Sequence, residues 1–247
     1  ISEELAESLD KEMKALHAVI ESLYGIYKSQ DDKFPVKKWS KLMVEAELML
    51  ETVEKMLVKL VESNPTYAPE VEESIKQRRE RYYLIVIATW AKYIDCLSLD
   101  ELADLDENPF GAVWFDGLLK KIAEFDYIFE DGSFVMHSTN YVYNCFDRLV
   151  DKLSKQSRLV SKSVNDLEFN PSENSPKEVK KLFEDLKKIG DGLKSFSGAV
   201  LVSLRKGHFK SNVRGIIRHV GNISAQHASI DRNIGVVLQR NIENYSD

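Results

Sequence analysis

Basic side chains near the end of the chain recur at a spacing that could bind an anion. The candidate anion-binding residues are Arg205, Lys206, Lys210, Arg214 and Arg218. At about 100° per helical residue, the last three form one ladder along the flank of a helix predicted over residues 208–220. Guanidinium groups match phosphate oxygens bidentately, so this ladder suits RNA or another polyanion. A solvated helix edge, or pairing with acids of the same chain, would explain the same spacing.

Charge is distributed unevenly along the chain. The segment from Lys194 to Arg240 has eight Lys or Arg residues and one acid, Asp231, and it holds three of the five histidines. This segment therefore carries a net charge of +7, whereas the rest of the chain carries −13 and the whole chain −6. A local excess of positive charge attracts anions, so the asymmetry marks the C-terminal segment as the place for an anionic partner.

The histidines of this segment add candidate acid–base chemistry. Arg214 and His219 stand in the order Arg-x4-His, and these six residues resemble the motif of HEPN ribonucleases, which are helical and use Arg and His without a metal. The resemblance implies that His219 is the acid or base and that Arg214 binds phosphate. The sequence departs from the family pattern at Gly215, where an Asn, Asp or His commonly follows the arginine. His227 shares the apolar face of a helix predicted over residues 223–242, which favours a hydrogen-bonded core histidine.

A second candidate site is acidic. Between Asp95 and Asp131 the sequence has eleven acids and two bases, with aromatic residues among them. The candidate partner-binding residues are Asp104, Asp106, Glu107, Trp114 and Phe115. An acidic and aromatic surface suits the docking of a protein, whereas core packing is the alternative explanation for the aromatics. The segment that starts at Asp104 begins like a calcium loop, but Pro109 occupies the position that needs glycine, so no metal site is predicted.

Motifs for catalysis or cofactor binding are absent from the sequence. It has no Walker loop, no GxGxxG, no GxSxG, no kinase signature and no zinc-finger spacing, so no cofactor is expected. Cys96 and Cys145 belong to no CxxC pair, which favours a reduced cytoplasmic or otherwise intracellular protein. The apolar run Tyr82–Ile94 contains Lys92 and is too short for a membrane span. Because the chain begins at Ile1 rather than at Met, a targeting signal ahead of it stays open.

Apolar residues recur at three-and-four spacing nearly throughout, which predicts an all-α fold. One stripe runs from Leu9 to Tyr27 and a second from Trp39 to Leu60, so a long N-terminal helical hairpin is expected. A third helix is expected over about Glu70 to Cys96, after two prolines end the second. The whole chain is predicted to form a single antiparallel bundle of about seven or eight helices.

The second half of the chain has clear helix start signals. Ser98 to Glu101 fits a capping box, and a single helix is expected over Ala112 to Phe129, followed by a long helix after Gly132. Ser175 to Glu178 fits the start of a further helix, in which Gly190 and Gly192 predict a bend rather than a stop. Two shorter helices are expected over residues 208–220 and 223–242.

The most polar connection, residues 165–175, suggests how the chain is organised. We expect an acidic helical core over residues 1–165 and a C-terminal helical subdomain with the basic edge over residues 166–247, packed together as one domain.

Two functions remain open at this point. The first is a non-catalytic interaction or scaffold protein that docks another protein, or self-associates, through its acidic and basic faces. It accounts for the long apolar stripes, the two charge poles and the missing catalytic motifs, which together favour a protein that is not an enzyme. The second is an RNA-binding protein, including a metal-independent HEPN-like ribonuclease, that uses the basic C-terminal helix.

Overall fold

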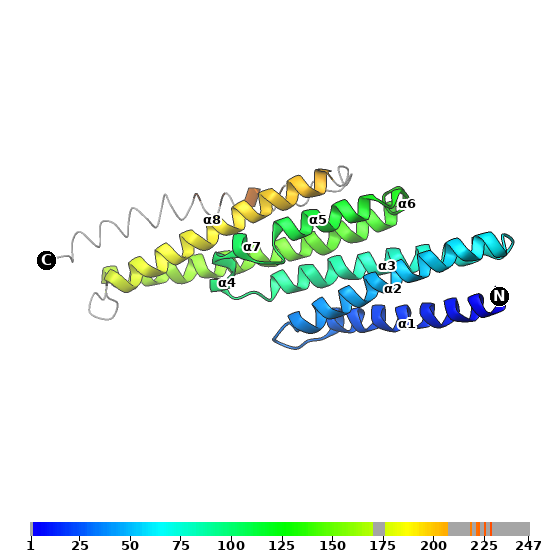
Figure 1. The fold of residues 1–247 in the computed structure, drawn as a ribbon. Helices are drawn as coiled ribbons and strands as arrows, with labels where there is room; N and C mark the ends of the chain where they lie inside the picture. The colour runs from blue at the N-terminus through cyan, green and yellow to red at the C-terminus, as the bar shows by residue number, and fades with distance from the viewer. Residues whose placement is uncertain are drawn as a thin grey trace. The chain divides into compact units, whose positions relative to one another are not determined.

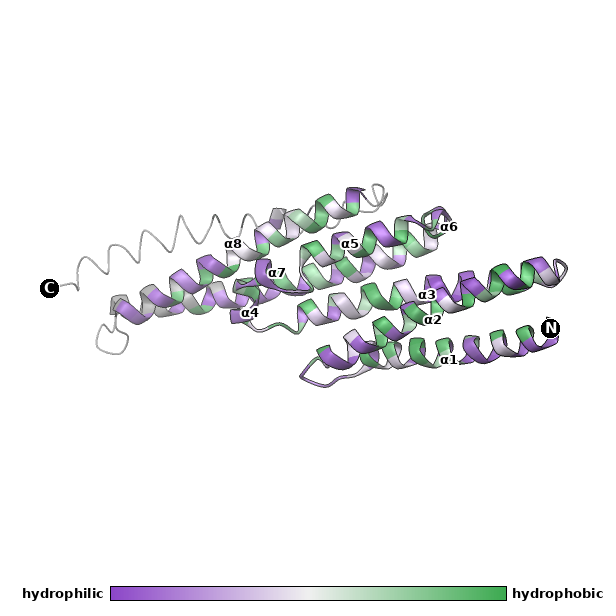
Figure 2. Cartoon of the chain, in the orientation of Figure 1, coloured by the Kyte–Doolittle hydropathy of each residue, from purple (hydrophilic) through white to green (hydrophobic). Residues whose placement is uncertain are grey.

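The computed structural model describes residues 2–169 and 176–206, together with residues 218, 221, 222, 225 and 228. Every regular element within these residues is a helix, and the all-α prediction is confirmed (Figure 1). Hydrophobic and hydrophilic residues are both spread along each helix, as expected when apolar residues recur at three-and-four spacing (Figure 2). The helices expected over residues 208–220 and 223–242 lie almost entirely outside the described residues.

The chain divides into two compact units. Unit 1 comprises Ile1–Cys96 and Asp131–Tyr141, and unit 2 comprises Leu97–Glu130 and Val142–Asp247. The long helix α7 (Gly132–Phe169) supplies residues to both units. The expected division between residues 165 and 166 stays a prediction, and in the structure α7 continues beyond it to Phe169.

Unit 1 is built on three long helices that each pack against the other two. They are α1 (Ser2–Lys28), α2 (Val36–Ser63) and α3 (Ala68–Asp95). The expected N-terminal hairpin is α1 and α2, and the apolar stripes face inward, since Leu16, Ile20, Trp39 and Val53 are fully buried. Burial of such side chains is the main force that stabilises a helical bundle.

Aromatic residues organise the contact between α2 and α3. The rings of Phe34, Trp39 and Tyr93 lie with centroids 5.3 to 5.6 Å apart. The indole Nε1 of Trp39 donates to Oγ1 of Thr89 at 2.9 Å, and the Thr89 hydroxyl lies 2.7 Å from the carbonyl oxygen of Ile85. This hydrogen bond satisfies the buried indole N–H, which would otherwise be costly.

The C-terminal end of α1 is closed by a side chain from α3. Lys92 Nζ donates to the carbonyl oxygens of Ile26 at 2.9 Å and Tyr27 at 3.0 Å, and also contacts that of Ser29. The last carbonyls of a helix have no partner within the helix and lie at the negative end of its dipole, so an ammonium group is favourable there. Lys92 therefore fixes the C-terminal end of α1 to α3.

Unit 2 combines short helices with two long helical segments. The elements are α4 (Leu99–Ala103), the 3₁₀ helix η1 (Leu105–Glu107), α5 (Ala112–Ala123), α6 (Asp126–Glu130), the second part of α7, and α8 (Pro176–Lys206). The capping box is confirmed: Ser98 Oγ accepts from the Glu101 amide at 3.2 Å, and Glu101 Oε1 accepts from the Ser98 amide at 3.1 Å. Two donors at the start of α4 are thereby satisfied.

The single helix expected over Ala112–Phe129 is wrong, because the structure has two helices there. The amides of Glu124 and Phe125 bond to the carbonyls of Lys121 and Ile122, three residues back, at 3.2 and 2.9 Å. This 3₁₀ pattern tightens the last turn of α5 and ends it.

Helix α8 begins at Pro176, as predicted, and passes through Gly190 and Gly192 without a break. It packs against α4, η1 and α5. A Cβ at Gly192 would lie 3.1 Å from the Leu102 carbonyl oxygen, so the missing side chain lets the backbone of α4 approach α8 closely. This contact fixes the position of α4 against α8.

Candidate functional site

Five carboxylates of α4, η1 and the residue between them are exposed and are here called the acidic surface. Its residues are Asp100, Glu101, Asp104, Asp106 and Glu107. Four of them, together with Asn108, line a shallow depression of about 280 Å³. The neighbouring Leu102 and Leu105 are buried, so the apolar and acidic residues of this short segment point in different directions. The structure thus places the predicted Asp104 and Glu107 in one depression, and the predicted Asp106 is exposed between them along the chain.

The backbone beneath the acidic surface is held by short-range contacts. A Cβ at Gly111 would lie 2.9 Å from the Leu105 carbonyl oxygen, so only glycine allows the chain to fold back this closely. Asn108 Oδ1 accepts from the Phe110 amide at 2.8 Å. Together with the capping box and the contact of Gly192, these interactions preorganise the turn that carries the acids.

One basic partner of the acidic surface comes from α8. Lys188 Nζ lies 3.4 Å from Asp104 Oδ1, and both side chains are about two-thirds exposed. Exposed ion pairs contribute little to stability, so this contact leaves the carboxylate accessible. Within the part of the chain that the structure describes, Asp106 and Glu107 have no ion-pair partner. Among the described residues, basic side chains therefore compensate little of the negative charge of the acidic surface.

The two predicted aromatic residues are placed differently from the acids. Phe115 is fully buried, so it belongs to the core and does not line the acidic surface. Trp114 is half-buried, and its ring lies edge-on to that of Phe110 with centroids 5.4 Å apart. Core packing, the alternative explanation for these aromatics, therefore holds for Phe115.

The predicted basic residues Arg205 and Lys206 are exposed in the last turn of α8. An acid of α5 lies beside them. The pKa of the Asp116 carboxyl is lowered, first by the hydrogen bond with Lys120, whose Nζ lies 2.9 Å from Oδ2, and further by Ser203 and Lys206. Lys206 therefore interacts with an acid of its own unit, which reduces the positive charge it offers to an anion.

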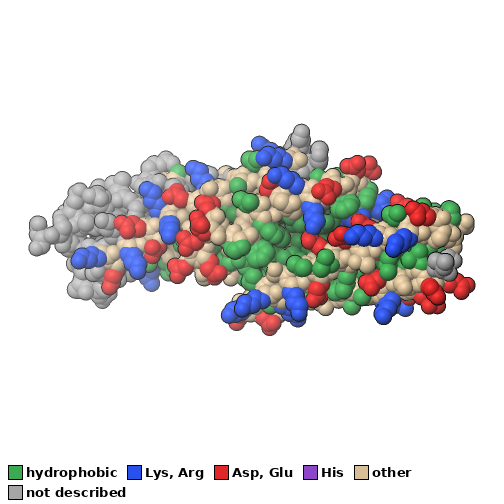
Figure 3. Space-filling view, in the orientation of Figure 1, with side chains coloured by type: hydrophobic (Ala, Val, Ile, Leu, Met, Phe, Trp, Pro, Cys, Tyr) green, Lys and Arg blue, Asp and Glu red, His purple; other side chains and the backbone are tan. Residues whose placement is uncertain are grey.

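Arg218 is the one described member of the basic ladder. Its Nη2 donates to Tyr143 Oη at 2.7 Å, and its guanidinium lies 5.9 Å from the centroid of that ring. Lys210, Arg214 and His219 lie outside the described residues, so the ladder and the Arg-x4-His pair stay predictions. Lys and Arg side chains are interspersed with acids over the face drawn in Figure 3.

No arrangement typical of a metal or membrane protein occurs in the described ranges. Among those residues, no group of three or more His, Cys, Asp or Glu side chains could hold a metal ion. No helix there is long and apolar enough to cross a membrane. No family model matches the chain, and no curated protein or solved structure matches it significantly.

One surface, on the outer side of α2, is not among the features predicted from the sequence. Val44, Leu48 and Val58 are more than half exposed there, although they lie in one of the best-packed helices of unit 1. The sequence gives only a weak signal for this surface, because its four-and-three spacing is complete only when the charged Glu51 and Lys55 are counted between Leu48 and Val58. The buried stripe of α2 contains larger apolar residues, such as Trp39 and Met43, so it dominates the apolar pattern of this helix.

Proposed function

We propose that this chain is a non-catalytic interaction protein that binds a protein partner or a second copy of itself through exposed charged faces. The observation that carries the proposal is the acidic surface: exposed carboxylates on a backbone fixed by Gly111, Gly192 and the capping box. Its chemistry suits a basic segment of a protein.

A fixed backbone favours binding because little conformational freedom is lost when the partner docks. The carboxylates of Asp104, Asp106 and Glu107 are exposed, so they attract a basic partner over a distance and raise its rate of association. Exposed charges at the rim of an interface contribute more to rate and specificity than to affinity. Binding through this surface should therefore weaken as salt is added.

RNA binding, with HEPN-like cleavage as its catalytic form, is the second proposal. It is supported by the exposure of Arg205, Lys206 and Arg218. Two contacts weigh against it, because Arg218 bonds to Tyr143 and Lys206 lies beside Asp116. We therefore rank protein docking first.

Comparative affinity purification tests the proposal. The tagged chain is recovered from cells that make it natively, alongside D104N/D106N/E107Q and a control, E3Q/E7Q/E72Q, that neutralises three exposed acids of unit 1. We expect at least one protein to bind the wild type and the control but not the acidic-surface variant. If all three chains recover the same proteins, the acidic surface is not the docking face. If recovery depends on RNA, which ribonuclease treatment reveals, the second proposal replaces the first.

A further inference from the structure

Helix α2 has an apolar stripe on each of two sides. The inner one is core, and the outer one contains Val44, Leu48 and Val58, which are 56%, 60% and 61% exposed. Single exposed apolar residues are ordinary, but these three follow a regular pattern with Glu51 and Lys55 between them. The steps from Val44 to Val58 alternate four and three, which is the spacing of the contact line between two coiled helices.

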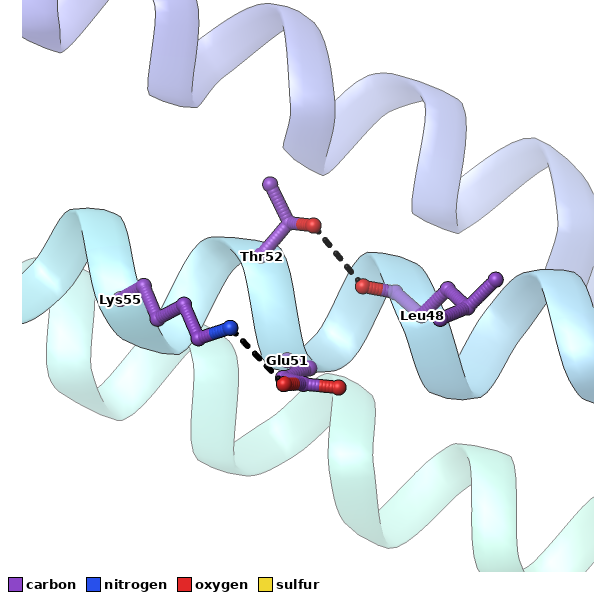
Figure 4. Close-up of polar contacts among 4 residues, drawn as sticks. All are labelled: Leu48, Glu51, Thr52 and Lys55. Carbon is purple, nitrogen blue, oxygen red and sulfur yellow. Dashed lines mark hydrogen bonds and ion pairs between the residues drawn. The ribbon is translucent and has the colours of Figure 1, made fainter.

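We call this line, Val44, Leu48, Glu51, Lys55 and Val58, the outer seam of α2. Figure 4 shows its centre, where Lys55 Nζ lies 2.8 Å from Glu51 Oε1 and both side chains are largely exposed. The neighbouring Thr52 hydroxyl donates to the Leu48 carbonyl oxygen at 2.9 Å, so its hydrogen is already used within the helix. The seam is therefore apolar toward both ends and carries one acid and one base in the middle.

From Leu48 to Val58, the order of residues along the seam is self-complementary about Val53. Leu48 lies five positions before Val53 and Val58 five positions after it, and Glu51 and Lys55 each lie two positions from it. In an antiparallel pair of identical helices centred there, Leu48 faces Val58 and Glu51 faces Lys55, each twice. A two-fold symmetric dimer requires this kind of self-complementary surface.

We propose that the outer seam of α2 binds the same seam of a second copy of this chain, with the two helices antiparallel. The inference deepens the proposed function by naming one partner, and it uses residues of unit 1 that the acidic surface does not contain. The two proposals can therefore fail separately.

Charge selects the antiparallel orientation over the parallel one. Antiparallel pairing places Glu51 opposite Lys55 of the second copy at two symmetric positions. On one flank it also brings Glu45 near Lys59 of that copy. A parallel pair in register would place Glu51 against Glu51 and Lys55 against Lys55, which is repulsive.

The dimer is expected to be reversible. Stable complexes commonly bury about 1,200 to 2,000 Å² in total, and one pair of helices lies at the low end of that range. Affinity should therefore depend visibly on single residues of the seam, and the charge pairs at its centre should decide whether the copies associate. The inner stripe of α2 stays buried in unit 1 and takes no part.

Charge reversal of the full-length chain tests the pairing by sedimentation equilibrium. E51K alone and K55E alone each set like charges opposite one another, so each is expected to raise the dimer dissociation constant by about tenfold or more. E51K/K55E restores opposite charges and should restore the dimer. A mixture of E51K and K55E should also associate, because every facing pair is then opposite in sign.

The matched control is D104N/D106N/E107Q, which leaves the seam intact and should dimerise like the wild type. Far-ultraviolet circular dichroism checks that each variant is folded, as expected for substitutions at exposed positions. A wild type that is monomeric at every concentration overturns the proposal. So does a dimer that the single reversals leave unchanged, which would indicate a parallel pair or a different interface.

Discussion

Removal of the Tyr82 hydroxyl gives a stability change whose size and sign depend on pH. The side chain is 1% exposed, and Oη lies 3.2 Å from the Met43 carbonyl oxygen and 3.3 Å from Glu47 Oε1. Burial, and then the Glu47 carboxylate, raises the pKa of Tyr82 well above its usual value of 10.0. The folded chain therefore keeps this proton at a pH at which the unfolded chain releases it.

The expected magnitudes follow from these contacts. At pH 7, Tyr82→Phe should lower the free energy of unfolding by about 1 kcal/mol, the usual contribution of one hydrogen bond. Above about pH 10 the unfolded chain releases the Tyr82 proton, whereas the folded chain keeps it. The wild type therefore loses stability as the pH rises above about 10. By about pH 11 this loss is on the order of 1 kcal/mol, and the Phe variant does not share it. The two stabilities should therefore cross between about pH 10.5 and 11.

Urea unfolding followed by circular dichroism at several pH values between about 7 and 11 measures this crossing. Groups other than Tyr82 titrate in both proteins and cancel in the difference. Tyr67→Phe, which removes an exposed hydroxyl, is the control and should change stability by less than about 0.5 kcal/mol at pH 7. A wild-type advantage that stays constant from pH 8 to pH 11 would refute the reasoning.

Two further predictions concern packing. Lys92→Met should destabilise the chain by about 1 to 3 kcal/mol in urea unfolding, because it removes the donor that closes α1, and the exposed Lys59→Met should change little. An equal effect of the two variants would contradict the capping role. Gly198→Ala meets nothing within 4 Å and should stabilise α8 by about 0.5 to 1 kcal/mol. Gly192→Ala should gain less, since its Cβ would lie 3.1 Å from the Leu102 carbonyl oxygen; thermal unfolding that ranks the two the other way would contradict the close approach.

Much of the fold could be predicted because the signals are local. The capping box at Ser98 depends on residues three apart, and the start of α8 depends on Pro176 and its neighbours. The N-terminal hairpin follows from two long apolar stripes and a break between them. The start signals depend on residues within one helical turn, and a long apolar stripe at three-and-four spacing is typical of a helix.

The remaining features depend on contacts that the sequence does not reveal. The end of α5 at Ala123 lies in a segment with good helical spacing, and it is set by a tightened last turn. Burial of Phe115 and exposure of Leu48 follow from which side of each helix faces its neighbours. Lys92 appears in the sequence only as an interruption of an apolar run, whereas in the structure it closes α1.

Comparative affinity purification in the presence of a second, differently tagged copy tests most directly whether the chain works by binding. We expect the wild type to recover both the second copy and at least one other protein. E51K should lose the second copy alone, and D104N/D106N/E107Q should lose the other protein alone. Identical recovery by all three chains, or no recovery of any protein, would contradict the claim.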